Sequence, residues 1–163
     1  MLVIKPYTQG DFKAIEVLLQ SVEWADQYVA GQLASISKMF IDPEGDVLVA
    51  MLSGSIVGFI QTQHYLWNRL SHIHGLVISP KYQKQGIGCK LVEHAEASAK
   101  KRGNRGLYVD TPVNNFGACS FYQAIGFLEG YIMPSYYEAA LDGVTFQKIF
   151  VSDSVQKSNS EHQ

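Results

Sequence analysis

The chain has 163 residues, of which 47% are apolar, and a formal net charge of −2 at pH 7. This length and composition predict one domain with a core of ordinary size, and the sequence pI of about 6.2 argues against a nucleic-acid partner. No apolar run reaches the roughly 20 residues of a membrane helix, and residues 1–6 lack a signal-peptide pattern, so we expect a cytoplasmic protein with no membrane partner.

The first half of the chain predicts a strand, two helices and an antiparallel pair of strands. Residues 2–4 form the short strand, and Thr8 caps a helix whose apolar side chains recur at helical spacing. The second helix is expected over residues 26–40. Strands at 47–51 and 56–63 follow, because a turn-forming Ser-Gly-Ser segment separates them.

The second half predicts strands that alternate with two helices. The strands are expected at 72–79, 107–111, about 127–138 and 144–151, with helices from 87 to the break at 101–106 and over 116–125. The order β-α-α-β-β-β-α-β-α-β-β predicts an α/β fold of the α+β kind, in which helices cover a mixed sheet. We expect a single domain over residues 1–151 and a polar, disordered tail over residues 152–163.

A glycine loop, Gln-Lys-Gln-Gly-Ile-Gly at 83–88, lies between a predicted strand and a predicted helix. Such a loop leaves backbone N–H groups free at a helix N-terminus, and the helix dipole adds positive potential, so the loop favours a phosphate. Its spacing matches neither the dinucleotide fingerprint nor the P-loop. Residues 81–105 carry seven basic and two acidic residues, a local charge of +5, which suits an anion or forms a solvated helix face.

Two motifs in the segment 72–127 together resemble the GNAT superfamily of N-acetyltransferases. The first is Leu-Val-Ile-Ser-Pro at 76–80 followed by Gln-x-x-Gly-x-Gly at 83–88. The second is Asn-x-x-Ala-x-x-Phe-Tyr-x-x-x-Gly-Phe at 115–127. The resemblance covers the whole predicted element order and implies a mixed, mostly antiparallel sheet of about seven strands flanked by about four helices.

The same resemblance implies acetyl-CoA as the cosubstrate. Its pyrophosphate would bind the N–H groups of the glycine loop, and its pantetheine arm would lie along strand 76–78, where that strand splays from the next. The residues implied in cofactor binding are Leu76, Val77, Ile78, Gln83, Lys84, Gln85, Gly86, Ile87, Gly88, Asn115 and Tyr122. The basic residues after the loop are candidates for the 3'-phosphate.

Acetyl transfer to an amine needs a base, donors for the oxyanion and a proton for the leaving thiolate. Tyr122 matches the family tyrosine beside the thioester sulfur, and a phenol with a pKa of about 10 can supply that proton. Tyr122 is therefore predicted to be the general acid. The alternative is that Tyr122 packs in an apolar helix context with its hydroxyl satisfied.

The base is predicted to be His74 or Asp110. Many family members have a glutamate where this chain has His74, and a neutral imidazole can also accept the proton. Strand alternation would place His72, His74, Leu76 and Ile78 on one face. Asp110 resembles the acidic residue of some ribosomal-protein N-terminal acetyltransferases. Both candidates also have a purely structural interpretation. His74 could be a strand histidine that is hydrogen-bonded to its neighbours, and Asp110 could brace the turn that follows it.

No metal site is expected. The His72-x-His74 pair lacks a third ligand at a suitable spacing, and Cys89 and Cys119 are too few for a disulfide framework or a zinc site, so both cysteines are expected to be reduced packing residues.

The acceptor site is expected to recognise a cationic amine. The resemblance implies that the first two helices and the loop between the last two strands build it, and these segments are acidic and aromatic. The candidate residues are Glu23, Trp24, Tyr28 and Tyr137. A small cationic amine is the favoured acceptor; a protein N-terminus or lysine, and a noncatalytic CoA sensor, remain alternatives. Nothing in the sequence fixes the oligomeric state, and a homodimer stays open.

Overall fold

The computed structural model describes residues 1–150, in which seven strands form one sheet in the order β1-β2-β3-β4-β5-β7-β6. The elements are β1 (Leu2–Pro6), α1 (Phe12–Gln20), α2 (Asp26–Ile41), β2 (Gly45–Leu52), β3 (Ser55–His64), β4 (Leu70–Ile78), α3 (Ile87–Lys101), β5 (Gly106–Pro112), α4 (Phe116–Ala124), β6 (Leu128–Glu138) and β7 (Leu141–Ile149). The predicted element order and mixed α/β sheet are confirmed. The tail expected at 152–163 lies outside the described residues.

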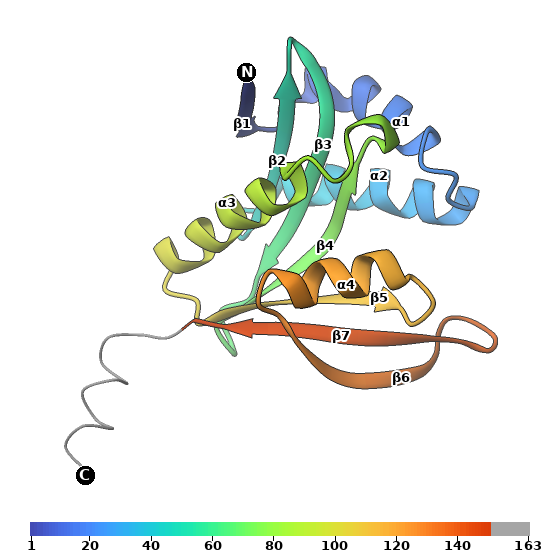
Figure 1. Ribbon diagram of the computed structural model, residues 1–163. Coiled ribbons are helices and arrows are strands. Elements are labelled where there is room, and N and C mark those ends of the chain that lie inside the picture. Colours follow the sequence, from blue (N-terminus) through green and yellow to red (C-terminus); the bar gives the residue numbers. More distant parts are fainter. Residues whose placement is uncertain (151–163) are drawn as a thin grey trace.

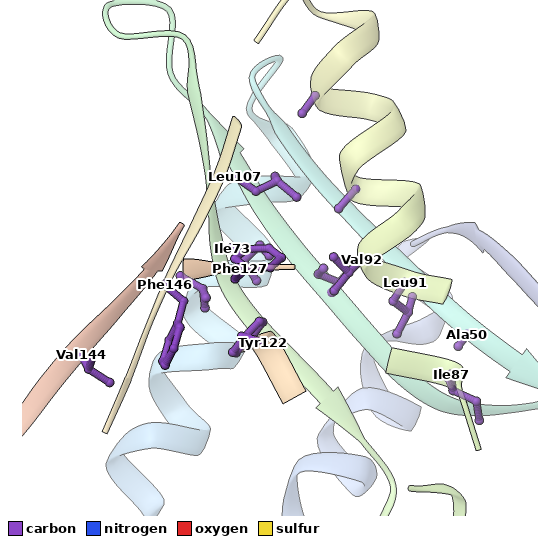
Figure 2. Packing of buried hydrophobic residues seen from close by; sticks show 14 of the residues in the cluster. Ala50, Ile73, Ile87, Leu91, Val92, Leu107, Tyr122, Phe127, Val144 and Phe146 are labelled. Carbon is purple, nitrogen blue, oxygen red and sulfur yellow. The ribbon is translucent and has the colours of Figure 1, made fainter. Parts of the chain in front are cut away.

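Helices cover both faces of the sheet (Figure 1). Helices α1 and α2 pack on one face around a core that includes Ile15, Ile36 and Phe59. Helix α3 packs on the other face, where Leu91 and Val92 point toward the sheet (Figure 2). This is the layered arrangement that amphipathic helices and a two-sided apolar sheet require. No helix within residues 1–150 combines the length and apolar character needed to cross a membrane.

Strands β4 and β5 diverge in the middle of the sheet (Figure 1). They pair in parallel only from Leu70 with Gly106 to Ile73 with Val109. Beyond that point β4 continues beside β3, whereas β5 continues beside β7. All other neighbouring strands are antiparallel. The sheet therefore opens at the place where the sequence predicts a splayed strand.

A β-bulge at His74 changes the direction of the side chains along β4. On the facing strand β3, Gln61 lies opposite Gly75 and Thr62 lies opposite Ile73, so His74 is the extra residue. A bulge reverses the alternation of the side chains that follow it.

The expectation that residues 72, 74, 76 and 78 share a face is therefore wrong. Leu76 packs in the same cluster as Ile73, three residues earlier, on the α3 side. His74 instead faces α2, where its Nδ1 lies 3.5 Å from Ser35 Oγ. His72 stays beside His74, with 4.6 Å between the ring centroids. The bulge keeps the two histidines together and turns the strand residues after them toward the other face.

A buried polar network joins β2, β3, β4 and α3. His64 Nδ1 lies 2.7 Å from Ser71 Oγ, and His64 Nε2 lies 2.7 Å from Asp46 Oδ2. Ser98 also donates to Asp46, and Arg102 lies 3.5 Å from its other oxygen. The hydrogen bond from His64, together with Ser98 and Arg102, lowers the pKa of Asp46 from 3.8 to about 2 although burial opposes the shift.

Replacing Asp46 by Asn should lower the free energy of unfolding by about 2 kcal/mol at pH 7, since each pKa unit is worth about 1.4 kcal/mol. A depressed folded pKa stabilises the fold above the unfolded pKa near 3.8 and loses that effect as the pH falls toward about 2. The difference between parent and variant in urea unfolding should therefore shrink below about pH 4. The exposed Glu93→Gln is the control, and a difference that does not depend on pH would contradict the explanation.

Candidate active site

The glycine loop forms an open cradle at the start of α3. Lys84 has a φ of 60° and Gly86 a φ of 82°, so the chain turns sharply through left-handed conformations just before Ile87. No side chain caps the first turn of α3. The backbone N–H groups of that turn are thus free to bind an anion.

The side-chain amides of the two glutamines of the loop bind backbone oxygens of the preceding segment. Gln83 Nε2 donates to the backbone oxygen of Ile78 at 3.2 Å, and Gln85 Nε2 donates to that of Lys81 at 3.4 Å. Both side chains therefore brace the loop against the preceding segment and leave the N–H groups uncovered.

A cavity of about 900 Å³ runs from this loop along the splayed end of β4. Its walls come from the α1–α2 connection, β4, the glycine loop, α3 and α4. Among the predicted cofactor-binding residues, those that line it are Leu76, Val77, Ile78, Gln83, Lys84, Gly86, Ile87, Gly88, Asn115 and Tyr122. Gln85 does not line it. Asn115 also caps α4, because its Oδ1 accepts the N–H of Ala118 at 3.2 Å.

A second cavity, of about 460 Å³, lies in the opening between β4 and β5. Its walls include residues 73–76 of β4 and 109–112 of β5, together with side chains of α2, α4, β6 and β7. The residues that line both cavities are Trp24, Leu76, Asn115, Ala118 and Tyr122. The two cavities therefore meet beside Tyr122.

Tyr122 is held rigidly where the cavities meet. Its ring lies among Phe121, Phe127 and Phe146, with centroid separations of 5.2, 5.3 and 6.0 Å. Only 5% of the residue is exposed, and this burial raises the pKa of Tyr122 well above its usual value of 10. Within residues 1–150 its hydroxyl forms no hydrogen bond with another residue, so a protonated phenol lines both cavities.

His74 lines the second cavity but is a weak base. Burial, with a further contribution from His72, lowers the pKa of His74 to about 4. Its Nε2 is buried and has no hydrogen-bond partner within residues 1–150. The imidazole is therefore neutral near pH 7 and binds a proton only weakly.

Asp110 lines the same cavity as a carboxylate with two hydrogen-bond donors. Asp110 Oδ2 lies 3.0 Å from His72 Nε2, and Asp110 Oδ1 accepts the hydroxyl of Thr145 at 3.0 Å. Burial alone would raise the pKa of Asp110, but the hydrogen bond and charge of His72, together with hydrogen bonds from Thr145 and Tyr136, lower it below 3.8. Asp110 is thus ionised near pH 7 and can attract a cation.

The four candidate acceptor residues do not all lie together. Trp24, Tyr28 and Tyr137 line the second cavity, whereas Glu23 lines only the first. Tyr28 Oη donates to Glu138 Oε1 at 2.7 Å, and the Tyr28 and Tyr137 rings meet edge to face at 6.4 Å. These contacts join α2 to the end of β6 across the cavity.

Gln32 of α2 lines the second cavity and was missed by the sequence analysis. Its Nε2 donates to the backbone oxygen of His74 at 3.0 Å, and its Oε1 accepts Gln61 Nε2 at 2.6 Å. The absent side chain of Gly75 makes room for it, because a Cβ there would overlap the Gln32 amide. Gln32 thereby holds the bulge at His74. The sequence around Gln32 gives no local signal for a contact with a strand residue 42 positions away.

Replacing Gly75 by Ala should lower the free energy of unfolding by about 1–3 kcal/mol, because the new methyl group displaces the Gln32 amide. The fully buried Gln61 Nε2 then loses its 2.6 Å hydrogen bond to Gln32 Oε1 and keeps only the longer one, 3.4 Å, to the Gln32 backbone oxygen. Urea unfolding measures the change. Gly31→Ala in α2 is the matched control, since a Cβ there meets nothing within 4 Å and Ala favours a helix. Equal effects of the two substitutions would contradict the role of Gln32.

Among residues 1–150, no group of three or more His, Cys, Asp or Glu side chains is placed to hold a metal ion. Cys89 and Cys119 are both free thiols, and burial raises the pKa of each.

Comparison with known proteins agrees with this geometry. The model of the acetyltransferase (GNAT) family matches residues 13–127. The [ribosomal protein bS18]-alanine N-acetyltransferase of Escherichia coli K12 is 32% identical over 85 residues, which cover 52% of this chain and 56% of that protein. The chain thus spans about half the length of the curated relatives it matches.

Solved structures share the fold. The ribosomal-protein-S18-alanine N-acetyltransferase of Escherichia coli superposes with a TM-score of 0.77 at 21% identity, over 94% of this chain and 97% of that chain. An aminoglycoside 6'-N-acetyltransferase complexed with coenzyme A superposes with a TM-score of 0.76 at 18% identity, over 92% and 98% of the two chains.

Proposed function

The chain belongs to the acetyltransferase (GNAT) family, and from that premise we propose that it transfers the acetyl group of acetyl-CoA to a primary amine, with a small cationic amine as the acceptor. One observation carries the proposal: a cavity that begins at an anion cradle and a cavity lined by the Asp110 carboxylate share Tyr122 as a lining residue. Direct transfer needs this arrangement, because donor and acceptor must meet beside a proton source.

The first cavity would hold acetyl-CoA. The free N–H groups at the start of α3 suit the pyrophosphate, and Lys84 adds positive charge at the cavity wall. The splayed end of β4 leaves the backbone of residues 76–78 without a strand on its β5 side, where the pantetheine amides can pair with it. The thioester would then lie near Tyr122.

The proposed reaction steps follow from the protonation states of Asp110, which lines the second cavity, and Tyr122, which lines both. Asp110 binds the acceptor ammonium, which loses one proton to solvent water, and the freed nitrogen lone pair attacks the thioester carbonyl carbon. The tetrahedral intermediate collapses, the carbon–sulfur bond breaks, and the Tyr122 hydroxyl protonates the departing thiolate. The nitrogen gives up its extra proton, which returns the Tyr122 phenolate to the phenol and leaves the amide product. Both pKa values are depressed, so neither Asp110 nor His74 is a strong base; Asp110 is favoured over His74 as the residue that holds the ammonium, because it brings a negative charge and His74 does not.

The second cavity favours a small acceptor. Trp24, Tyr28 and Tyr137 offer ring faces to a cation, and Asp110 offers the charge. The hydrogen bond between Tyr28 and Glu138 joins the two sides of the cavity, which leaves less room for a polypeptide chain. Protein N-terminal acetylation is the second candidate, because a relative named as a [ribosomal protein bS18]-alanine N-acetyltransferase is 32% identical over its matched region.

The test is acetyl-CoA-dependent thiol release by the purified full chain. The panel contains matched primary amines, diamines and aminoglycosides, with peptides that begin with alanine and the same peptides blocked at the N-terminus. We expect thiol release with the small amines and one acetyl group in the product by mass spectrometry. Activity only with free peptide N-termini would establish the second candidate. Tight acetyl-CoA binding with no amine-dependent release would favour a noncatalytic sensor.

A further inference from the structure

His72 occupies a defined place beside Asp110. In the parallel ladder His72 lies opposite Tyr108, so Asp110, two residues later, is its diagonal neighbour on the same face. The His72 imidazole stacks on the Tyr108 ring with centroids 4.2 Å apart and planes 5° apart. His74 meets the imidazole edge to face at 4.6 Å. The ring is thus held in one orientation, with Nε2 aimed at Asp110 Oδ2.

Residues of the two strands beside β5 form hydrogen bonds with the Asp110 carboxylate. His72 on β4 reaches Oδ2 at 3.0 Å, and Thr145 on β7 donates to Oδ1 at 3.0 Å. A carboxylate has about four lone-pair sites, so two donors fix its plane and leave sites free for a substrate. Because Asp110 lines the acceptor cavity, these free sites are available to an ammonium.

We propose that His72 is a positioning residue for acetyl transfer: its Nε2–H holds the Asp110 carboxylate so that a free lone pair meets the acceptor ammonium. The inference rests on the proposed function. An imidazole suits this role, because its ring N–H donates one hydrogen bond and the stack on Tyr108 fixes the direction of that donor. Asp110 accepts only, so it selects the tautomer that carries hydrogen on Nε2.

Other titratable groups also face Asp110 and bear on its pH dependence. They are His72 and His74 from β4, Tyr136 and Tyr137 from β6, and Tyr108 on its own strand. The tyrosines stay protonated near neutral pH, because burial raises the pKa of each, that of Tyr108 to about 12. His74 and Asp110, whose pKa values are both lowered, therefore bear on the acidic side of the pH dependence.

Two substitutions separate the hydrogen bond from packing. His72→Phe keeps the stack on Tyr108 and removes the donor, whereas His72→Gln keeps a donor. We expect His72→Phe to lower kcat/KM for the amine about tenfold at pH 7, with KM for acetyl-CoA unchanged, and His72→Gln to retain most of the activity. In an Asp110→Asn background His72→Phe should add little. Equal losses in both backgrounds, or equal losses from Phe and Gln, would overturn the proposal.

A second measurement does not depend on activity. NMR titration of the Asp110 side-chain carboxyl carbon in the full chain should give a higher pKa in His72→Phe than in the parent, because the His72 partner lowers it. An unchanged Asp110 titration would refute the link between the two residues. If the parent acetylates no amine, the proposed function fails, and the titration still decides whether His72 controls Asp110.

Discussion

Replacing Tyr122 by Phe should lower kcat for amine acetylation about 100-fold, with KM for acetyl-CoA unchanged, since a positioned general acid contributes about 10²- to 10⁴-fold. The buried phenol keeps its proton at neutral pH, because burial raises its pKa far above 10. It can therefore protonate the thiolate of CoA as the carbon–sulfur bond breaks. Steady-state thiol release at saturating acetyl-CoA measures the effect.

The Phe variant should remain folded, which makes the kinetic result interpretable. The Tyr122 ring packs against Phe127 and Phe146, and Phe keeps those contacts. The lost hydroxyl has no hydrogen-bond partner within residues 1–150, so the free energy of unfolding should change by less than about 0.5 kcal/mol. Tyr131→Phe, on the exposed face of β6, is the matched control. A Phe variant with the kcat of the parent would show that the thiolate leaves without a proton from Tyr122.

The donor side of the site was predictable because its signals are local. The glycine loop specifies the N-terminus of α3 within six residues, 83–88, and Gly86 takes the positive φ of 82° that the sharp turn requires. Asn115 likewise caps the helix that carries Tyr122. Each of these positions depends on neighbours in the chain, so a sequence pattern can report it.

The acceptor side was less predictable because its contacts join distant segments. The bulge at His74 depends on Gln32, 42 positions away in the chain, and period-two alternation gave the wrong face for the residues after it. His72 and Asp110 are 38 positions apart, and Tyr28 and Glu138 are 110 apart. No local pattern encodes such pairs. The sequence therefore indicated the types of residue in this cavity without the hydrogen bonds that orient them.

Replacing Asp110 by Asn should lower kcat/KM for the amine about 100-fold, again with KM for acetyl-CoA unchanged. Asn is nearly isosteric: its side-chain oxygen can accept the hydrogen bond of His72, and its NH2 can donate to the Thr145 hydroxyl, so the geometry should survive while the charge is lost. An ammonium then loses the counter-charge that holds it beside the thioester. Thiol release at varied amine concentration measures the change, and a loss confined to KM for the amine would assign Asp110 to binding alone.

The lowered pKa of Asp110 determines how the effect of Asp110→Asn varies with pH. The folded pKa of Asp110 lies below its usual value of 3.8, so the carboxylate is ionised at neutral and mildly acidic pH, and its contribution disappears only as the pH falls through the lowered pKa. The parent and the Asn variant should therefore differ by a constant factor around neutral pH. His74→Gln should change kcat/KM much less, because an imidazole with a pKa near 4 is a weak proton acceptor. If His74→Gln were the more damaging substitution, the proton would pass to the imidazole, and Asp110 would serve to hold the ammonium in place.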